Sequence, residues 1–345
     1  MKLGELMAKV TIKDVAKEAG VSISTVSNAL NNVDVLNPQT KKHVLEVAER
    51  MNYIPDLRGK NLKAKNTKMI GFFTTSVGGS YFHNLVESMS NECDRHGYGL
   101  NIFFSKDKNV ILNNILGGSV DAAIIFSYEY IKEKEIELIN NQNIKTVFFD
   151  REVHNKNMGS ILFDSYNSGY EATSYLLNLG HKKIVYISGR GSTYDSEERK
   201  KGYITALKEF GIEPNPDYII RGFYEKEAGY NAVRSFINQH PREIPDAFLA
   251  GNDLSAIGAI EALESEGLRV PKDVSVMGFD DIEIAQYYNP QLTTVRNQIS
   301  RQGILAVQHA IKLINGESEG KIYKLPGKII GRDSTGVRTG IRKQL

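Results

Sequence analysis

The stretch VSISTVSNAL, residues 21–30, combines a helical spacing of apolar residues with a run of small polar side chains. Val26, Ala29 and Leu30 recur at the spacing that places them on one face of a helix. Ser22 precedes this helix at the position where a hydroxyl caps free backbone N–H groups. The outward face is left with short side chains, namely Ile23, Ser24, Ser27 and Asn28. We therefore expect a short helix with a buried apolar stripe and a polar surface suited to contact with a partner.

Two further helices are expected on either side of this stretch. Residues 11–20, TIKDVAKEAG, begin with Thr11 as a cap, have Asp14 three residues later and end at Gly20, which permits a left-handed backbone. After LNPQT, residues 36–40, Thr40 is expected to cap a third helix within KKHVLEVAERMNYI. Two short helices with a glycine between them are typical of a helix-turn-helix. On pattern alone, a three-helix domain with a merely solvated outer face stays open as an alternative.

The second helix carries side chains suited to both base edges and phosphates. Ile23 suits contact with a thymine methyl group, and the Asn28 amide suits pairing with adenine. The hydroxyls of Ser22, Thr25 and Ser27 suit phosphate oxygens. The charge distribution agrees, since residues 1–68 hold 12 Lys and Arg against 7 Asp and Glu, whereas the rest of the chain holds 31 against 34. Such an asymmetry is expected if only the front unit meets phosphates.

Composition limits the remaining classes. With 41% hydrophobic and 24% charged residues, the 345-residue chain is typical of a globular protein of two or three packed units. The single cysteine, Cys93, excludes an intramolecular disulfide and a structural cysteine zinc site. No apolar run reaches the roughly 18 residues of a membrane span, and the first residues lack the apolar core of an export signal. We expect a cytoplasmic protein with no membrane partner.

From Lys68 onward, short apolar runs alternate with helical patterns. The runs expected to form buried strands are MIGFFTT, GLNIFFS, AAIIFS, TVFFD, KIVYIS, YIIRGF, AFLAGN and VSVMGFD. Their alternation with helices predicts two doubly wound α/β lobes with mostly parallel sheets. Such sheets bind ligands at the carboxyl ends of their strands, so the residues that follow the runs form the candidate site.

Charged groups, amides and flat aromatic side chains follow these runs. Carboxylates and guanidinium groups bind pairs of hydroxyls, and an aromatic ring covers the apolar face of a sugar. These residue types favour a sugar, while a purine or nucleoside would also stack on the rings. Asn252 and Asp253 allow a second interpretation, as caps of the helix LSAIGAIEAL, and Asp280 allows one as a turn residue.

Catalytic and cofactor motifs are missing from the sequence. The loop GRGSTYDSEERKKG, residues 189–202, lacks the glycine spacing of both phosphate-binding motifs. Neither a metal-binding His pair nor a nucleophile elbow occurs, and no carboxylate pair accompanies a nucleophile. We therefore expect a binding protein and not an enzyme, with no catalytic residue, no cofactor and no metal.

The segment VTIKDVAKEAGVSISTVSNALNN, residues 10–32, followed by NYIPD and KNLKAKNTKMIG, resembles the DNA-binding head and hinge of the LacI/GalR family of bacterial transcription regulators. Later landmarks of that family occur in order along the whole chain. The resemblance implies an all-α helix-turn-helix head joined to an α/β periplasmic-binding-protein-like core of two doubly wound parallel-sheet lobes. The positions expected to contact DNA are Thr11, Ser22, Ile23, Ser24, Thr25, Ser27, Asn28, Asn31, Lys60, Asn61, Leu62 and Lys63.

Within the core, the resemblance adds to the strand-end pattern. Positions that match Arg199, Asn252 and Asp280 contact the small-molecule effector in the family, and an aromatic residue packs against it where Tyr224 stands. The full set of expected effector contacts is Tyr81, Phe82, Asp150, Thr193, Asp195, Arg199, Tyr224, Asn252 and Asp280.

The hinge departs from the family's pattern. In the family this segment becomes helical when two subunits sit on DNA, and a leucine matching Leu62 enters the minor groove as a wedge. Where relatives commonly carry Ala-Arg-Ser-Leu, this chain has Gly59, Lys60, Asn61 and Leu62. Since glycine raises the entropic cost of a helix, we expect hinge helicity to depend strongly on the operator.

The expected domain limits follow from these assignments. Residues 1–8 form an N-terminal extension, 9–56 the helix-turn-helix domain, 57–67 the hinge, and 68–345 the effector-binding and dimerisation core. The first lobe is expected to comprise about 69–163 and 297–325, and the second about 164–296 and 326–342. Relatives begin close to MAKVTIKDVA, so we also expect Met7 to be the natural start and residues 2–6 to be a translated leader.

The expected function is that of a homodimeric repressor of a carbohydrate-utilisation operon, which binds a pseudo-palindromic operator and is released by a sugar-type effector. One alternative is a regulator whose corepressor, a purine, nucleoside or other metabolite, tightens DNA binding. A solute-binding module without DNA binding is disfavoured by the basic head and the missing export signal.

Overall fold

The computed structural model describes residues 10–31, 35–54, 66–191, 193–241 and 243–338. The chain divides into two compact units, Met1–Asn66 and Thr67–Leu345, and each is described by itself. The domain limits expected from the sequence stay predictions.

The described residues of the first unit contain three helices: α1 (Ile12–Glu18), α2 (Ile23–Leu30) and α3 (Pro38–Arg50). The Thr11 backbone N–H and hydroxyl donate to Asp14 Oδ2 at 2.8 and 2.7 Å, and Gly20 has a φ of +66°, as expected for the start and stop of α1. The Ser22 hydroxyl accepts from the Thr25 N–H at 3.1 Å at the start of α2. The expected helix-turn-helix is therefore present, with both of its caps.

The predicted cap of the third helix is wrong. Asn37 precedes α3 and accepts a hydrogen bond from the Gln39 N–H at 2.8 Å, while Pro38 occupies the first helical turn. Proline suits that position because its fixed φ is helical and it has no N–H to satisfy, so the helix begins before Thr40. The three helices close over a small core in which Val15, Val26 and Val44 are fully buried.

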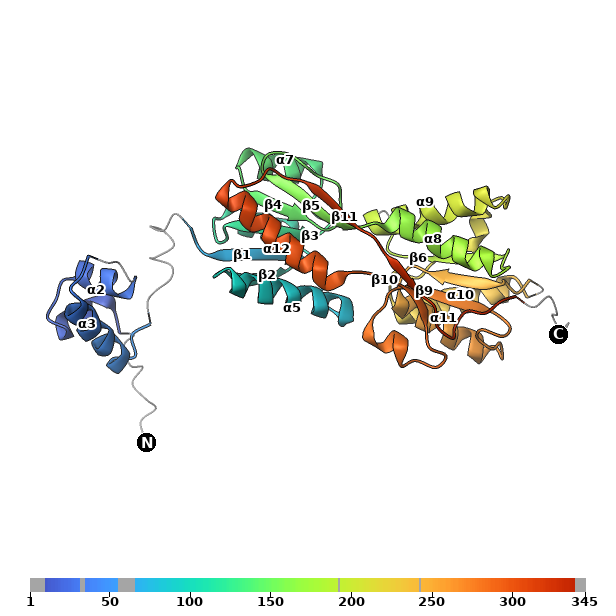
Figure 1. Cartoon of the computed structure of the whole chain (residues 1–345), viewed down its shortest axis with the longest axis horizontal. Helices are drawn as coiled ribbons and strands as arrows, with labels where there is room; N and C mark the ends of the chain where they lie inside the picture. Colours follow the sequence, from blue (N-terminus) through green and yellow to red (C-terminus); the bar gives the residue numbers. More distant parts are fainter. Residues whose placement is uncertain (1–9, 32–34, 55–65, 192, 242, 339–345) are drawn as a thin grey trace, which may run out of the picture. The chain divides into compact units, whose positions relative to one another are not determined.

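The second unit holds two six-stranded sheets, each with helices on both faces (Figure 1). We name the first lobe after the sheet of order β11-β5-β4-β3-β1-β2. Its strands are β1 (Met69–Thr74), β2 (Gly99–Phe104), β3 (Ala122–Phe126), β4 (Lys145–Phe148), β5 (Met158–Phe163) and β11 (Ile322–Leu325). Its helices are α5 (Gly79–Arg95), α6 (Lys108–Leu116), α7 (Glu133–Asn141) and α12 (Ile299–Asn315).

The second lobe has the sheet of order β12-β10-β9-β8-β6-β7. Its strands are β6 (Ile184–Ser188), β7 (Ile219–Arg221), β8 (Ala247–Ala250), β9 (Ser275–Asp280), β10 (Thr293–Arg296) and β12 (Lys328–Ile330). Its helices are α8 (Ser165–Asn178), α9 (Tyr194–Glu209), α10 (Lys226–Gln239) and α11 (Asp253–Ser265), with short 3-10 helices at Pro216–Tyr218 and Glu283–Gln286. All pairs in both sheets are parallel except β10 with β12.

The predicted class, a helix-turn-helix head before two doubly wound lobes, is confirmed. All eight predicted strands are present, and β5, β10, β11 and β12 add to them. The chain passes between the lobes three times: between β5 and α8, between β10 and α12, and between β11 and β12. Each lobe therefore contains segments far apart in sequence, and in Figure 1 the late segment α12 lies on the sheet built from β1, β3 and β4.

Apolar side chains fill the space between each sheet and its helices. In the first lobe, Phe72 and Ile124 pack with α5 and α12 on one face, and Phe73 and Ile125 pack on the other. Among the residues the structure describes, Cys93 is a free, buried thiol in this core. No helix in the described ranges is long and apolar enough to cross a membrane.

Candidate functional site

A cavity of about 340 Å³ lies between the carboxyl ends of the strands of the two lobes. All nine residues predicted to contact an effector line it: Tyr81, Phe82, Asp150, Thr193, Asp195, Arg199, Tyr224, Asn252 and Asp280. The structure thus brings together side chains that are up to 199 positions apart. Their contact with a ligand stays a prediction.

The first lobe contributes an aromatic wall. The rings of Tyr81 and Phe82, on α5, lie 5.3 Å apart edge to face, and Phe126, at the end of β3, lies 5.6 Å from Phe82. Ring geometry of this kind presents flat apolar surface to a ligand. The Tyr81 hydroxyl donates to Gln302 Oε1 of α12 at 3.4 Å, and the three rings give this wall a largely apolar surface.

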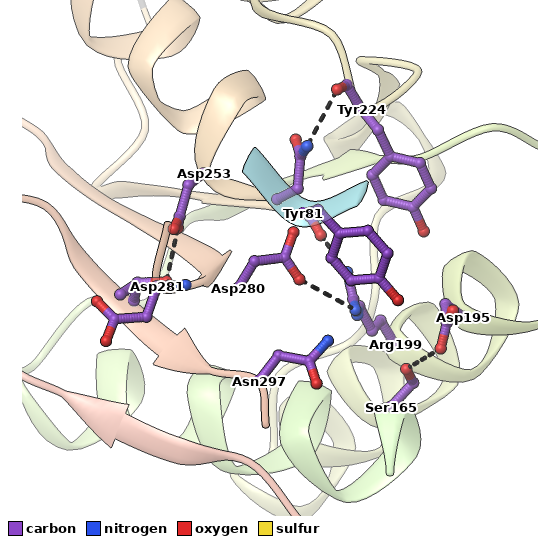
Figure 2. A network of polar contacts seen from close by, with 12 residues as sticks. Tyr81, Ser165, Asp195, Arg199, Tyr224, Asp253, Asp280, Asp281 and Asn297 are labelled. Atoms are coloured by element: carbon purple, nitrogen blue, oxygen red, sulfur yellow. Dashed lines mark hydrogen bonds and ion pairs between the residues drawn. The ribbon is translucent and has the colours of Figure 1, made fainter. Parts of the chain in front are cut away.

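The second lobe contributes a polar wall centred on Arg199 (Figure 2). This side chain comes from α9, is 4% exposed and lies 3.9 Å from Asp280 Oδ1. Its Nη1 donates to the Gly251 carbonyl, and its guanidinium carbon lies 4.7 Å from the ring centre of Phe279. Its buried Nε has no hydrogen-bond partner among the described residues.

Two carboxylates lie near this one guanidinium: Asp280 is buried and Asp195 is half-buried. Asp195 Oδ1 accepts from the Ser165 hydroxyl at 2.6 Å, and Figure 2 shows both side chains beside Arg199. Burial raises the pKa of Asp195 and of Asp280, while the Arg199 charge opposes the rise at both. The polar wall can therefore accept hydrogen bonds from hydroxyl or N–H groups of a bound molecule.

Left-handed backbone positions Tyr224 and Asp280. Phe223 and Tyr224, just after β7, have φ of 54° and 64°, and Asp280 and Asp281, at the end of β9, have φ of 106° and 56°. Such conformations cost free energy for residues other than glycine and occur where surrounding contacts enforce them. Here Asp281 accepts from the Arg296 Nε at 2.6 Å and pairs with Arg332 at the same distance.

Glycine makes room for the Tyr224 ring. A Cβ on Gly189 would meet Tyr224 ring atoms at 1.9–2.4 Å, and one on Gly251 would meet the ring at 3.2 Å. The ring is therefore seated between two strand ends where no side chain fits. Burial raises the pKa of the Tyr224 hydroxyl to about 12, so this residue enters the site as a neutral phenol.

Two residues at the cavity serve the protein's own fold. Asn252 caps α11 by accepting from the Ser255 N–H at 3.0 Å, and its amide donates to the Tyr224 carbonyl at 3.0 Å. The capping interpretation of Asn252 is thus what the structure displays. Asp253 accepts from the Ile282 N–H and the Thr294 hydroxyl at 2.9 and 2.6 Å.

Asp150 and Thr193 are also engaged. Asp150 is 2% exposed and accepts from the Ser127 N–H at 2.6 Å and the Arg151 Nε at 2.8 Å. Burial raises the pKa of Asp150, and Arg151 opposes the rise. The Thr193 hydroxyl donates to the Arg190 carbonyl at 2.9 Å.

Several lining residues escaped the sequence analysis. Asn297 follows β10, a strand that was not predicted, so the strand-end rule could not reach it. Phe126 and Tyr128 end and follow β3, and the same rule applied to AAIIFS would have found them. Tyr194 lines the cavity and donates from the second lobe to Glu152 Oε1 of the first at 2.7 Å.

The residues predicted to contact DNA lie on the helical unit or outside the described residues. Ile23 is 45% exposed, Ser24 is exposed, and Ser27 and Asn28 are half-buried on α2. The hydroxyls of Ser22, Ser24 and Thr25 are linked at 2.7 and 2.8 Å, and Asn31 donates to the Ser27 carbonyl at 2.9 Å. Thr11 is exposed at the start of α1. Lys60, Asn61, Leu62 and Lys63, together with Gly59, lie outside the described residues.

No metal site emerges from the described residues, since they contain no group of three or more His, Cys, Asp or Glu side chains able to hold an ion.

Comparison with known proteins links both units to regulators. Residues 11–56 match the model of bacterial regulatory proteins of the lacI family, and residues 173–335 match that of the periplasmic binding protein-like domain. The HTH-type transcriptional repressor PurR of Pasteurella multocida (strain Pm70) is 36% identical over 315 residues, which cover 90% of this chain and 93% of that protein. A probable HTH-type transcriptional repressor, ExuR of Bacillus subtilis (strain 168), is 35% identical over 322 residues, 92% of this chain and 95% of that protein.

Among solved structures, a lac repressor dimer bound to operator and the anti-inducer ONPF superposes with a TM-score of 0.82. It is 25% identical in sequence, and the match covers 95% of this chain and all of that one. The likeness thus spans the head and the core together.

Proposed function

The chain belongs to the lacI family of bacterial regulatory proteins and is a DNA-binding transcriptional repressor, and from this premise we propose how it is switched. It binds a pseudo-palindromic operator as a homodimer, and a small molecule in the cavity between the lobes releases it. Since its target is the chromosome, we place its action in the cytoplasm. No catalytic step is part of the proposal.

The observation that carries this proposal is the two-sided cavity. An aromatic wall from the first lobe faces a polar wall from the second, and such a pair suits a ring molecule with one apolar face and a hydrogen-bonding edge. A sugar has this form, and we propose a sugar as the effector. Arg199 and Asp280 bind its hydroxyls, and Tyr224 covers one face.

The head reads DNA through α2 in this proposal. Ile23 and Asn28 contact base edges, and the hydroxyls of Ser22, Thr25 and Ser27 contact phosphates, as the outward side of a recognition helix allows. The predicted contacts of residues 60–63 with the minor groove belong to the same proposal.

In this proposal the two lobes couple the effector cavity to the DNA-binding heads. Three chain crossings allow the lobes to change their arrangement around a ligand, and this change alters the spacing of the two heads of a dimer. Coupling of this kind is reciprocal, so operator must weaken effector binding by the factor by which effector weakens operator binding.

A second candidate is a corepressor-dependent regulator that takes a purine or nucleoside. Relatives named PurR favour it, and the aromatic wall would stack on a purine as well as on a sugar. The two candidates predict opposite effects of the ligand on operator affinity: an inducer weakens operator binding, whereas a corepressor tightens it.

The test starts with selection of the operator from random duplexes by the full-length protein. Fluorescence anisotropy on that operator is then measured with and without compounds that raise the melting temperature of the protein. We expect weaker operator binding with a sugar, whereas tighter binding with a nucleobase supports the second candidate. Equal compound affinity with and without operator would refute the switch.

A further inference from the structure

The cavity wall has more carboxyl groups than cationic groups, and this limits which molecules can enter. The described lining residues include six carboxylates, Glu129, Asp150, Asp195, Glu225, Asp253 and Asp280, and two guanidinium groups, Arg190 and Arg199. Building on the proposed function, we infer that Asp195 and Asp280 exclude anions, so that the effector is an uncharged ring molecule with hydroxyl or N–H donors. Sugar phosphates, uronates and nucleotides are excluded.

Both cationic groups at the cavity already face carboxylates. Arg190 Nη2 lies 2.8 Å from Glu225 Oε1, and Arg199 lies 3.9 Å from Asp280 and beside Asp195. A phosphate or carboxylate that approaches either guanidinium would therefore also approach a carboxylate, which carries the same sign of charge. At Asp280, which is 8% exposed, like charges repel strongly because little water screens them.

Asp150 and its neighbouring cation, Arg151, offer no binding position for an anion. Arg151 donates to Asp150 from Nε at 2.8 Å, also donates to the Ile131 carbonyl, and is 7% exposed. Arg151 is thus held behind the wall by groups of the first lobe and does not line the cavity.

The ring faces of the aromatic wall give an anion no favourable contact. The faces of the rings of Tyr81, Phe82 and Phe126 carry the negative side of the aromatic quadrupole. The C–H groups of a sugar or the plane of a neutral base pack well against such faces. Both walls therefore favour the same class of ligand.

The polar wall keeps free acceptor positions. Asp195 accepts one hydrogen bond, from Ser165, among the described contacts, although a carboxylate has about four acceptor positions. A ligand that satisfies it must bring O–H or N–H groups. Sugars and neutral nucleobases have these groups in common, and the experiment below separates them.

The experiment captures the ligand without assuming its identity. The full-length protein is incubated with the metabolite extract of its own cells, separated by gel filtration and unfolded, and the released compounds are identified by mass spectrometry in both ion modes. We expect enrichment of an uncharged sugar, nucleobase or nucleoside. Enrichment of a phosphorylated or carboxylated compound overturns the inference but leaves the proposed function standing, whereas no enrichment of any compound contradicts the proposed function itself.

A matched variant tests the role of Asp195. The captured compound and its anionic counterpart, a uronate or phosphate of the same ring, are titrated calorimetrically into wild type, Asp195→Asn and Asp217→Asn. We expect the wild type to bind the anion about 100-fold more weakly than the neutral compound. Asp195→Asn should narrow that ratio at least tenfold, while Asp217→Asn, which changes an exposed carboxylate outside the cavity lining, should leave it unchanged. An unchanged ratio in Asp195→Asn overturns the assignment.

Discussion

Replacing Gly189 by alanine should displace the Tyr224 ring from its position in the cavity. The added Cβ would lie 1.9 Å from one ring atom and 2.4 Å or less from two others, and no real structure tolerates such contacts. Tyr224 must therefore leave its place in the cavity. Gly191, two residues along the same loop, is the matched control, because a Cβ there meets nothing within 4 Å.

The expected losses of stability and of effector affinity follow from the surroundings of Gly189 and of the Tyr224 ring. Overpacking at Gly189 should cost about 1–3 kcal/mol of stability. For a chain of this size that corresponds to a fall in melting temperature of roughly 2–4 °C per kcal/mol. The loss of the aromatic contact should weaken effector binding by about 10-fold to 100-fold, since each tenfold step is about 1.4 kcal/mol. Gly191→Ala removes the same backbone freedom from the unfolded chain, so the comparison cancels that effect.

Calorimetric titration with the captured effector and thermal melting of Gly189→Ala, Gly191→Ala and wild type measure both quantities. Operator affinity without effector, from anisotropy, should stay within about threefold in both variants, because the head is untouched. If Gly189→Ala binds effector as tightly as Gly191→Ala does, Gly189 is not needed to make room for the Tyr224 ring.

Three further predictions concern other parts of the chain. Asn28→Ala should relax base preference at one position per half-site by about 1–3 kcal/mol in a binding-site selection, whereas a uniform loss over all sequences would make it a phosphate contact. Asp121→Ala removes the acceptor for three hydrogen bonds, from the Thr67 N–H and hydroxyl and the Lys68 N–H at 2.6–2.9 Å, and should cost about 1–3 kcal/mol and speed tryptic cleavage at Lys68; an unchanged cleavage rate would contradict this anchor role. Burial lowers the pKa of His309 to about 4, so the unfolded chain binds more protons between pH 4 and 6.5, and stability should fall by on the order of 3 kcal/mol at most as pH drops through that window. Urea unfolding of His309→Gln should show a flatter profile there, and a profile as steep as that of wild type would rule out His309 as the cause.

Local signals in the sequence were enough for the head and for most of the strands. Thr11, Gly20 and Ser22 act within three residues of themselves, so their roles follow from short-range hydrogen bonding and backbone sterics. Thr40 was misassigned for an equally local reason, because Asn37 caps the helix three residues earlier and Pro38 occupies its first turn.

The strands that escaped prediction have a different cause. β5 contains Gly159 and Ser160, which interrupt its apolar run, although all six of its residues are buried. β11 and β12 are short edge strands with exposed polar residues, so their character depends on the neighbours they pair with. Only the three-dimensional arrangement supplies those neighbours.

For the cavity, the strand-end rule found the wall but could not say which side chains are free. Asn252 and Asp150 follow their strands as a ligand contact would, yet the structure engages Asn252 with α11 and Asp150 with Arg151. Whether a polar side chain is satisfied depends on partners from other segments, and these partners cannot be read from spacing. The strand-end rule therefore predicted which residues line the cavity, but it did not predict which of their polar groups are free to bind a ligand.

The threefold crossing between the lobes also governs the order in which this protein can mature on the ribosome. The first lobe lacks α12 and the edge strand β11 until residue 325 has emerged, by which time β6 to β10 of the second lobe have already been made. The second sheet in turn receives its edge strand β12 only from residues 328–330. Nascent chains of this repressor thus expose the flank of β5 until nearly the whole core has been translated, and truncation before α12 leaves two incomplete sheets behind a helical head whose three helices are already complete.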